Sequence, residues 1–193
     1  MLRITQTLLS SWLYTFKRED GYDDFLTTLN REKQPPSEAM LNGIEFESLV
    51  NSALDGTPPP ADHKWRECVE WCADYLKGAQ KQVLLTKPLM VDGDELLLVG
   101  VLDFLRASVI FDTKFSKTYS VGKYLRSPQT SAYFALCEEA KRFEYVVSDG
   151  DYVYRETYTP DEVEPIENTI HNFLQFVKLH GLYEVYKEKW RVE

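Results

Sequence analysis

Charged residues interrupt apolar segments of the kind that form buried strands, and this constrains the fold more than any other feature. The stretch VGVLDFLRASVIFDTKF, residues 99–115, carries Asp103, Asp112 and Lys114 among aliphatic and aromatic residues. Burying a charge without a partner is costly. Side chains alternate across a strand, so Asp112 and Lys114 share one face, and Asp103 can face the same pocket if the two strands pair. The sequence therefore predicts two carboxylates and a lysine gathered on neighbouring strands.

The elements around this segment predict an α/β fold in which helices surround one central mixed sheet. The length, 193 residues, favours one domain over 1–193. Alternation and turn signals predict strands at 82–91, 96–105 and 109–115, and a hairpin at 143–158 around Asp149-Gly150. Helical spacing and capping residues predict helices from Thr5 to Phe16, Glu38 to Leu54 after Ser37, Asp62 to Gly78, Pro128 to Lys141, and Thr159 through Leu179.

Composition and charge narrow the class of protein. The apolar share is 44% and the charged share 27%, as in soluble globular proteins, and no apolar run is long enough to span a bilayer. The three cysteines are an odd number, which argues against a secreted disulfide framework. We therefore expect a cytoplasmic protein with no membrane partner. A net charge of −9 gives no overall attraction to DNA, so a nucleic-acid partner requires a local basic patch.

Such a patch follows the second aspartate. From Arg106 to Arg126 the only acidic residue is Asp112, while the chain supplies five basic residues there and interleaves Tyr119 and Tyr124. Cations beside aromatic rings suit single-stranded DNA ends. We prefer a substrate-contact role over an ordinary solvated loop, and the predicted substrate contacts from this segment are Lys117, Lys123 and Arg126. The acidic stretch 138–167 is instead expected to be solvated or to face a partner subunit.

Two carboxylates beside a lysine suit a hard divalent cation such as Mg²⁺, which prefers oxygen ligands and keeps several waters. One or two such ions can bind a scissile phosphate and lower the pKa of a water molecule. The lysine would orient that water or stabilise the charge that develops on the phosphate. The alternative is a buried salt bridge between Asp112 and Lys114, which the short motif DTK favours when it is taken alone.

Two further segments favour the catalytic interpretation. In GIEFESL, residues 43–49, Glu47 falls on a largely apolar helix face and is a third candidate carboxylate, whereas Glu45 is expected in solvent. In SPQTSAYFAL, residues 127–136, Gln129 and Tyr133 share a helix face and could contact a phosphate or a base. Each has a plain alternative: surface glutamates on an amphipathic helix, and a core tyrosine beside an exposed glutamine.

Together, an early helical glutamate, GVLD, FDTK and QTSAY resemble the PD-(D/E)XK nucleases, in particular their RecB-like and phage-type exonuclease branch. The resemblance covers residues 43–136 and implies a restriction-endonuclease-like core. It implies that Asp103 and Asp112 bind metal, that Lys114 is the catalytic lysine, and that the Thr113 carbonyl is an added ligand. Glu47 would complete the metal site, at a position where many members carry histidine. Gln129 and Tyr133 would help to position the DNA strand.

The sequence also departs from the family pattern. Leu102 stands where the family name places proline, although the branch often has G-x-x-D, as in residues 100–103. Members with an iron–sulfur cluster carry one early and three late cysteines, and Cys68, Cys72 and Cys137 do not follow that arrangement, so we expect no cluster. Cys68 and Cys72 are instead expected to pack in the core.

The resemblance implies a Mg²⁺- or Mn²⁺-dependent deoxyribonuclease, an exonuclease acting on single- or double-stranded linear DNA ends. Two alternatives stay open: a catalytically inactive nuclease-fold module that binds DNA or assists assembly, and a structure-dependent endonuclease. A homo-oligomer, or a single-strand-binding or recombination partner, is compatible with the sequence but is not indicated by any residue pattern.

Overall fold

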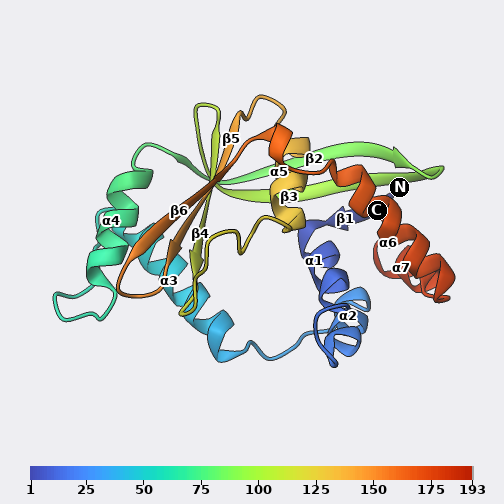
Figure 1. The fold of residues 1–193 in the computed structure, drawn as a ribbon, viewed down its shortest axis with the longest axis horizontal. Coiled ribbons are helices and arrows are strands. Elements are labelled where there is room, and N and C mark those ends of the chain that lie inside the picture. Colours follow the sequence, from blue (N-terminus) through green and yellow to red (C-terminus); the bar gives the residue numbers. More distant parts are fainter. Residues whose placement is uncertain (193) are drawn as a thin grey trace.

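A six-stranded mixed sheet lies at the centre of the fold, with helices around it (Figure 1). The computed structural model describes residues 1–192. The strands are β1 (Leu2–Thr5), β2 (Gln80–Val91), β3 (Asp94–Arg106), β4 (Val109–Phe115), β5 (Arg142–Ser148) and β6 (Val153–Tyr158). The helices are α1 (Gln6–Tyr14), α2 (Gly21–Leu29), α3 (Glu38–Leu54), α4 (Arg66–Leu76), α5 (Pro128–Leu136), α6 (Ile166–Leu179) and α7 (Tyr183–Lys189), with a 3-10 turn at Pro160–Glu162.

Strand β3 organises the sheet because it pairs with three other strands. The order is β1-β3-β4-β5-β6, and β2 pairs with β3 as an antiparallel hairpin. β1 runs parallel to β3 and β4 parallel to β5, whereas β3 with β4 and β5 with β6 are antiparallel. The predicted fold class, α/β with a central mixed sheet flanked by helices, is confirmed. The three predicted strands and the hairpin around Asp149-Gly150 are also present.

Two apolar clusters hold the helices to the sheet. One contains residues of α1, α2, α5, α6 and α7, including the fully buried Leu8, Phe25 and Phe173. The other joins α3 and α4 to β3, β4 and β5 through Phe46, Val69 and their neighbours. Figure 1 shows α3 and α4 beside β4 and β6, with α1, α2, α6 and α7 gathered at the other end of the molecule. Among residues 1–192, no helix is both long enough and apolar enough to cross a bilayer.

The N-terminal segment differs from the prediction. The helix predicted from Thr5 to Phe16 is present as the shorter α1, and the strand β1 before it was not predicted. The Thr5 hydroxyl caps α1 by accepting a hydrogen bond from the Leu8 amide at 3.2 Å. A strand of four residues is too short for its alternation to stand out. Helix α2 was not predicted, because its buried residues stand among charged and polar ones.

Three other helix boundaries also differ. Helix α4 begins at Arg66, and its N-cap residue Trp65 makes no side-chain cap, so the proposed cap at Asp62 is wrong. Helix α5 ends at Leu136 rather than Lys141. The capping box of Thr159 and Glu162 is present, but it caps the 3-10 turn. Helix α6 starts only after Pro165, and α7 was not predicted.

Candidate active site

Asp103 on β3 and Asp112 on β4 lie next to each other where the pairing of these two strands ends. β3 and β4 pair from Arg106 opposite Val109 to Phe104 opposite Phe111, and their pairing ends there. Asp103 and Asp112 are the next residues along the two strands. Their carboxyl groups interact, because Asp112 contributes to the raised pKa of Asp103. The strand geometry thus gathers both aspartates at the point where β3 and β4 diverge.

Asp112 is the most deeply placed of the acidic residues, with 1% of its surface exposed. Its Oδ1 accepts a hydrogen bond from Gln129 Nε2 at 2.6 Å. Its Oδ2 forms an ion pair with Lys114 Nζ at 2.6 Å. No other partner of Oδ2 is present within residues 1–192. Since a carboxylate oxygen has two lone pairs, Oδ2 can still accept a further ligand.

Lys114 faces this carboxylate from the same side of β4. Burial alone would lower the pKa of the ammonium group, but Asp112 and Asp103 outweigh that effect, and the net result is a raised pKa. About a third of the Lys114 side chain, 32%, stays exposed. Lys114 is therefore a cation at neutral pH and reaches solvent from a largely buried stem.

Asp103 and Glu47 add negative charge to the same place. Burial and the charge of Asp112 raise the pKa of Asp103 to about 9, from an ordinary value of 3.8. Glu47 is half-buried on α3, and burial followed by the charge of Asp112 also raises its pKa. Three carboxyl groups within electrostatic reach destabilise one another. A purely structural salt bridge between Asp112 and Lys114 would not require the carboxyl groups of Asp103 and Glu47 beside it.

Gln82 is a neighbour of this cluster that the sequence did not reveal. It lies on β2 opposite Asp103, between the pairs Lys81↔Phe104 and Val83↔Leu102. Its backbone has a φ of +52°, a left-handed conformation that is unfavourable for glutamine. Its Nε2 donates a long hydrogen bond of 3.4 Å to Glu47 Oε1. Strained backbone of this kind is often found at functional sites.

Helix α5 supports the site from within the core. Ser127 caps it and Pro128 occupies the first turn, as predicted. Gln129 and Tyr133 are both buried, so the alternative of an exposed glutamine is wrong. The Tyr133 hydroxyl donates a hydrogen bond to the Val101 carbonyl at 2.8 Å. Both side chains are thus engaged within the protein, and direct contact between them and DNA stays a prediction.

Gly100 explains how close α5 comes to β3. A Cβ atom at this position would lie 2.6 Å from Leu136 Cδ1 and 3.0 Å from Tyr133 Cε1. Only glycine leaves room for these two side chains without a shift. The glycine of the G-x-x-D motif therefore serves the packing that places α5, and with it Gln129, against the aspartates.

A pocket of about 440 Å³ opens onto Lys114 and Gln129. One wall is the 123–129 segment, which brings Lys123 and Arg126 to the pocket. The other wall is a face of α1, whose contribution was not predicted: Gln6, Ser10, Leu13, Tyr14 and the following Lys17. None of the residues that line the pocket is acidic, although the chain carries a net charge of −9. A polyanion is the ligand that such a lining favours.

The basic loop between β4 and α5 is fastened by a buried carboxylate that the sequence analysis missed. Glu156 on β6 accepts hydrogen bonds from the Tyr119 hydroxyl at 2.7 Å and from the Gly122 amide at 3.2 Å. It also accepts from the Tyr124 amide at 3.3 Å and from a second tyrosine hydroxyl, that of Tyr158. Hydrogen bonds to a charged acceptor are stronger than neutral ones. Glu156 therefore fixes the segment that carries the predicted DNA contacts.

The three predicted basic contacts differ in their surroundings. Lys117 lies 3.6 Å from Glu38 at the start of α3 and does not line the pocket. Lys123 lines it, while its Nζ also contacts Ser116 Oγ at 2.5 Å and the Thr118 carbonyl at 3.1 Å. Arg126 lines the pocket and makes no ion pair among the described residues. Of the three, Arg126 is the freest to bind a phosphate.

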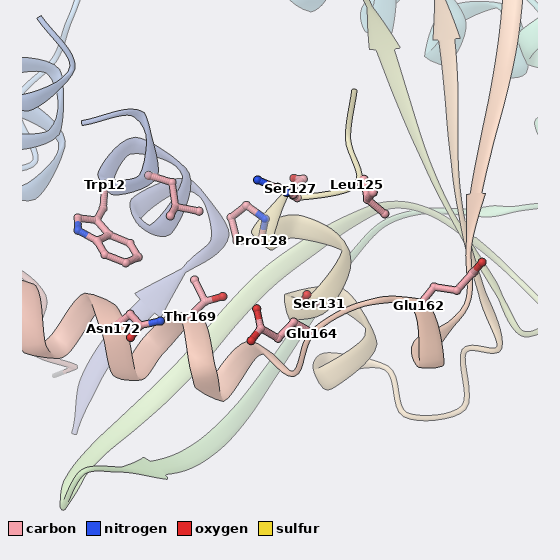
Figure 2. Close-up of a pocket in the computed structure, with 11 residues that line it drawn as sticks. Trp12, Leu125, Ser127, Pro128, Ser131, Glu162, Glu164, Thr169 and Asn172 are labelled. Carbon is pink, nitrogen blue, oxygen red and sulfur yellow. The ribbon is translucent and has the colours of Figure 1, made fainter. Parts of the chain in front are cut away.

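A second cavity of about 550 Å³ adjoins the first and shares Leu13, Arg126, Ser127 and Pro128 with it. Figure 2 shows it between α1, α5 and α6, with Trp12 on one side and Thr169 and Asn172 of α6 on another. Glu162 and Glu164 also line this cavity. The surface therefore changes from basic to partly acidic beyond Arg126.

The donor set fits a metal ion that keeps much of its own water. Within residues 1–192, no group of three or more His, Cys, Asp and Glu side chains forms a ready-made metal cage. Mg²⁺ is commonly held by one or two carboxylates and by substrate phosphates rather than by such a cage. Oδ2 of Asp112, whose one partner is Lys114, matches that mode together with the neighbouring Asp103. Thr113 is buried, and its carbonyl as a ligand stays a prediction.

The three cysteines lie in the core. Cys68, Cys72 and Cys137 are free and buried, with Cys68 and Cys72 packed in the cluster beneath α3 and α4. Burial raises the pKa of the Cys72 thiol to about 12, so this group stays protonated at neutral pH. The predicted core packing of Cys68 and Cys72 agrees with the structure.

Comparison with known proteins supports the fold. No family model matches the chain, and no curated protein matches it. The crystal structure of SSO0001 aligns with a TM-score of 0.55 and 15% identity, over 91% of this chain and 76% of that one. The crystal structure of LHK-Exo in complex with dAMP aligns with a TM-score of 0.49 and 15% identity, over 96% and 92%. At this identity, we take from the first likeness a shared fold only.

Proposed function

We propose that this chain is a metal-dependent deoxyribonuclease that hydrolyses phosphodiester bonds of DNA. The observation that carries the proposal is the cluster of Asp112, Asp103 and Glu47 around Lys114, in which the buried Asp112 raises the pKa of both other carboxyl groups and its Oδ2 pairs with Lys114 Nζ at 2.6 Å. Mutual repulsion of three carboxyl groups around a single lysine costs stability. A divalent cation would relieve it, and groups with strongly perturbed pKa values gather at functional sites.

Asp112, Asp103 and Glu47 would hold Mg²⁺ or Mn²⁺, and the ion would supply charge stabilisation at the phosphate and a more acidic bound water. Lys114 acts as a cation, because its raised pKa keeps it protonated. Its exposed end can donate hydrogen bonds to a phosphate oxygen or orient a water molecule. Gln129 keeps Asp112 in place through its 2.6 Å hydrogen bond. Gln82 does the same for Glu47 through a longer hydrogen bond.

The basic pocket supports DNA as the substrate and a strand end as the place of attack. Lys17, Lys123 and Arg126 line it together with Lys114. Beyond Arg126, Glu162 and Glu164 line the adjoining cavity, and their negative charge would repel a phosphate backbone that continued past the pocket. A strand that ends in the pocket avoids this repulsion. This favours an exonuclease, acting on linear DNA, over an enzyme that cuts within a strand.

A second candidate function is a DNA-binding or assembly module that keeps the fold without turnover. The 2.6 Å ion pair of Lys114 with Asp112 favours it, because the pair would be stable without a metal ion. Metal binding separates the two. Any ligand that binds only the folded state raises its melting temperature.

The test is a melting curve with EDTA, Mg²⁺ or Mn²⁺ for the wild type and for Asp103→Asn, with Asp62→Asn as the matched control. Asp62 is an exposed loop residue, so its variant makes the same chemical substitution away from the site. We expect Mn²⁺ to stabilise the wild type and Asp62→Asn, and to stabilise Asp103→Asn much less. Equal shifts for all three proteins, or none for the wild type, would contradict the metal site.

A further inference from the structure

Helix α1 presents an aromatic ring and a free cation to the pocket beside Lys114. Gln6, Ser10, Leu13, Tyr14 and Lys17 recur at helical spacing and line the same wall. Lys17 directly follows the helix and its turn. This wall faces the segment of Arg126 and Gln129. The pocket thus joins two parts of the chain that are more than a hundred residues apart.

Tyr14 has the properties of a stacking platform. It is 51% exposed, and it packs against no other aromatic ring among residues 1–192. Lys17 Nζ lies 5.5 Å from the centre of its ring. An aromatic ring with one accessible face can stack on a nucleobase of any identity. Because about half of the Tyr14 side chain lies in solvent, it contributes little to the packing of the core.

The charges of the pocket complement a phosphate beside that base. Lys17 and Arg126 both line the pocket and have no ion-pair partner within the described residues. Both reach the pocket that also contains Lys114. Free cations around an accessible ring are the combination by which proteins hold single-stranded DNA.

The size of the pocket limits what can enter. A volume of about 440 Å³ lies in the range of sites for one small-molecule ligand, which is room for about one nucleotide. Beyond Arg126, Glu162 and Glu164 line the adjoining cavity and would repel the next phosphate (Figure 2).

From these observations we infer that Tyr14 and Lys17 bind one unpaired nucleotide at a DNA strand end, with its base stacked on Tyr14 and its phosphate between Lys17 and Arg126. The inference deepens the proposed function and rests on it for the identity of the polymer. It specifies the substrate as a single-stranded or frayed end. A fully paired blunt end must open before its last nucleotide reaches the pocket.

Binding without metal tests the inference separately from hydrolysis. The probe is a short single-stranded oligonucleotide with 2-aminopurine at one end, whose fluorescence falls when the base stacks, measured in EDTA. We expect Tyr14→Ala to weaken binding about tenfold and to abolish the quenching, and Tyr14→Phe to restore both. Tyr152→Ala is the control, because Tyr152 is an exposed tyrosine on the β5–β6 turn.

Hydrolysis with Mn²⁺ supplies the second measurement. Tyr14→Ala and Lys17→Ala should raise KM for single strands about tenfold with kcat changed much less, and blunt duplex should be a poorer substrate than the single strand. Unchanged binding and KM in Tyr14→Ala, or preference for blunt duplex, would overturn the inference while leaving the nuclease proposal intact. Absence of any hydrolysis, with Tyr14-dependent binding retained, would overturn the nuclease proposal alone.

Discussion

Replacing Asp103 by asparagine should make the metal-free protein more stable while it abolishes metal-dependent activity. The pKa of Asp103 is raised to about 9 because the group is buried beside Asp112. Folding therefore favours its protonated form. Stability is lost as the pH rises from the ordinary pKa of 3.8 towards 9, because the unfolded chain gains free energy by ionising this group while the folded protein keeps it protonated. Asparagine keeps the shape of the side chain and does not ionise in either state.

The shift sets the size of the effect. A carboxyl group with these two pKa values would cost about 4 kcal/mol at pH 7 if it were sealed from water. Asp103 is half-buried, and water that reaches it screens the repulsion, so we expect a gain of about 1–2 kcal/mol. For a chain of this length, that gain raises the melting temperature by about 2–8 °C.

The assay is thermal unfolding in EDTA at pH 6, 7 and 8 for the wild type, Asp103→Asn and the Asp62→Asn control. The gain from Asp103→Asn should grow with pH, and the control should show none. Asp112→Asn should behave oppositely and lose about 1–3 kcal/mol, because it leaves Lys114 without its partner. A melting temperature that falls in Asp103→Asn at pH 7, or a gain independent of pH, would refute this reasoning.

Three more substitutions probe the surroundings of the site. Glu156→Gln should loosen the basic loop, raise KM for DNA several-fold and cost about 1–3 kcal/mol, and an unchanged KM would contradict its anchoring role. Gln82→Gly should relieve about 1 kcal/mol of backbone strain and so raise the melting temperature; a lowered melting temperature would argue against strain. The same variant should need more Mn²⁺ for half-maximal activity, because Glu47 loses its hydrogen bond from Gln82. Gly100→Ala should cost about 1–3 kcal/mol by displacing Tyr133, which unfolding in urea measures; a neutral result would show that α5 can shift freely.

The sequence predicted those parts of the site that depend on local pattern. Asp112 and Lys114 had to share a face because they are two residues apart on a strand. Asp103 could join them only if β3 paired with β4, and the apolar runs on both sides made that pairing the natural one. The alternation of strands and the Asp149-Gly150 turn are local signals of the same kind, and the hairpin followed from them.

The rest depends on how distant segments pack. In the sequence, Tyr14 and Lys17 look like an ordinary helix end. Their role depends on β1, which pairs with β3 and so places α1 with these two residues beside Lys114. Glu156 reads as an exposed strand residue, because only the folded loop brings amide and hydroxyl donors to it. No local pattern signals the left-handed φ of Gln82. These residues act through contacts that arise only in the folded chain.

The measurement that tests the central claim most directly is hydrolysis of end-labelled linear single-stranded, linear duplex and closed circular DNA, with EDTA, Mg²⁺ or Mn²⁺. Wild type is compared with Lys114→Ala and with Lys141→Ala, which removes an exposed lysine that lines neither of the two cavities. We predict metal-dependent loss of linear DNA, fastest for the single strand, in the wild type and Lys141→Ala but not in Lys114→Ala. Cutting of the circle would contradict the exonuclease assignment, and hydrolysis that persists in Lys114→Ala, or fails in every protein, would contradict the active site.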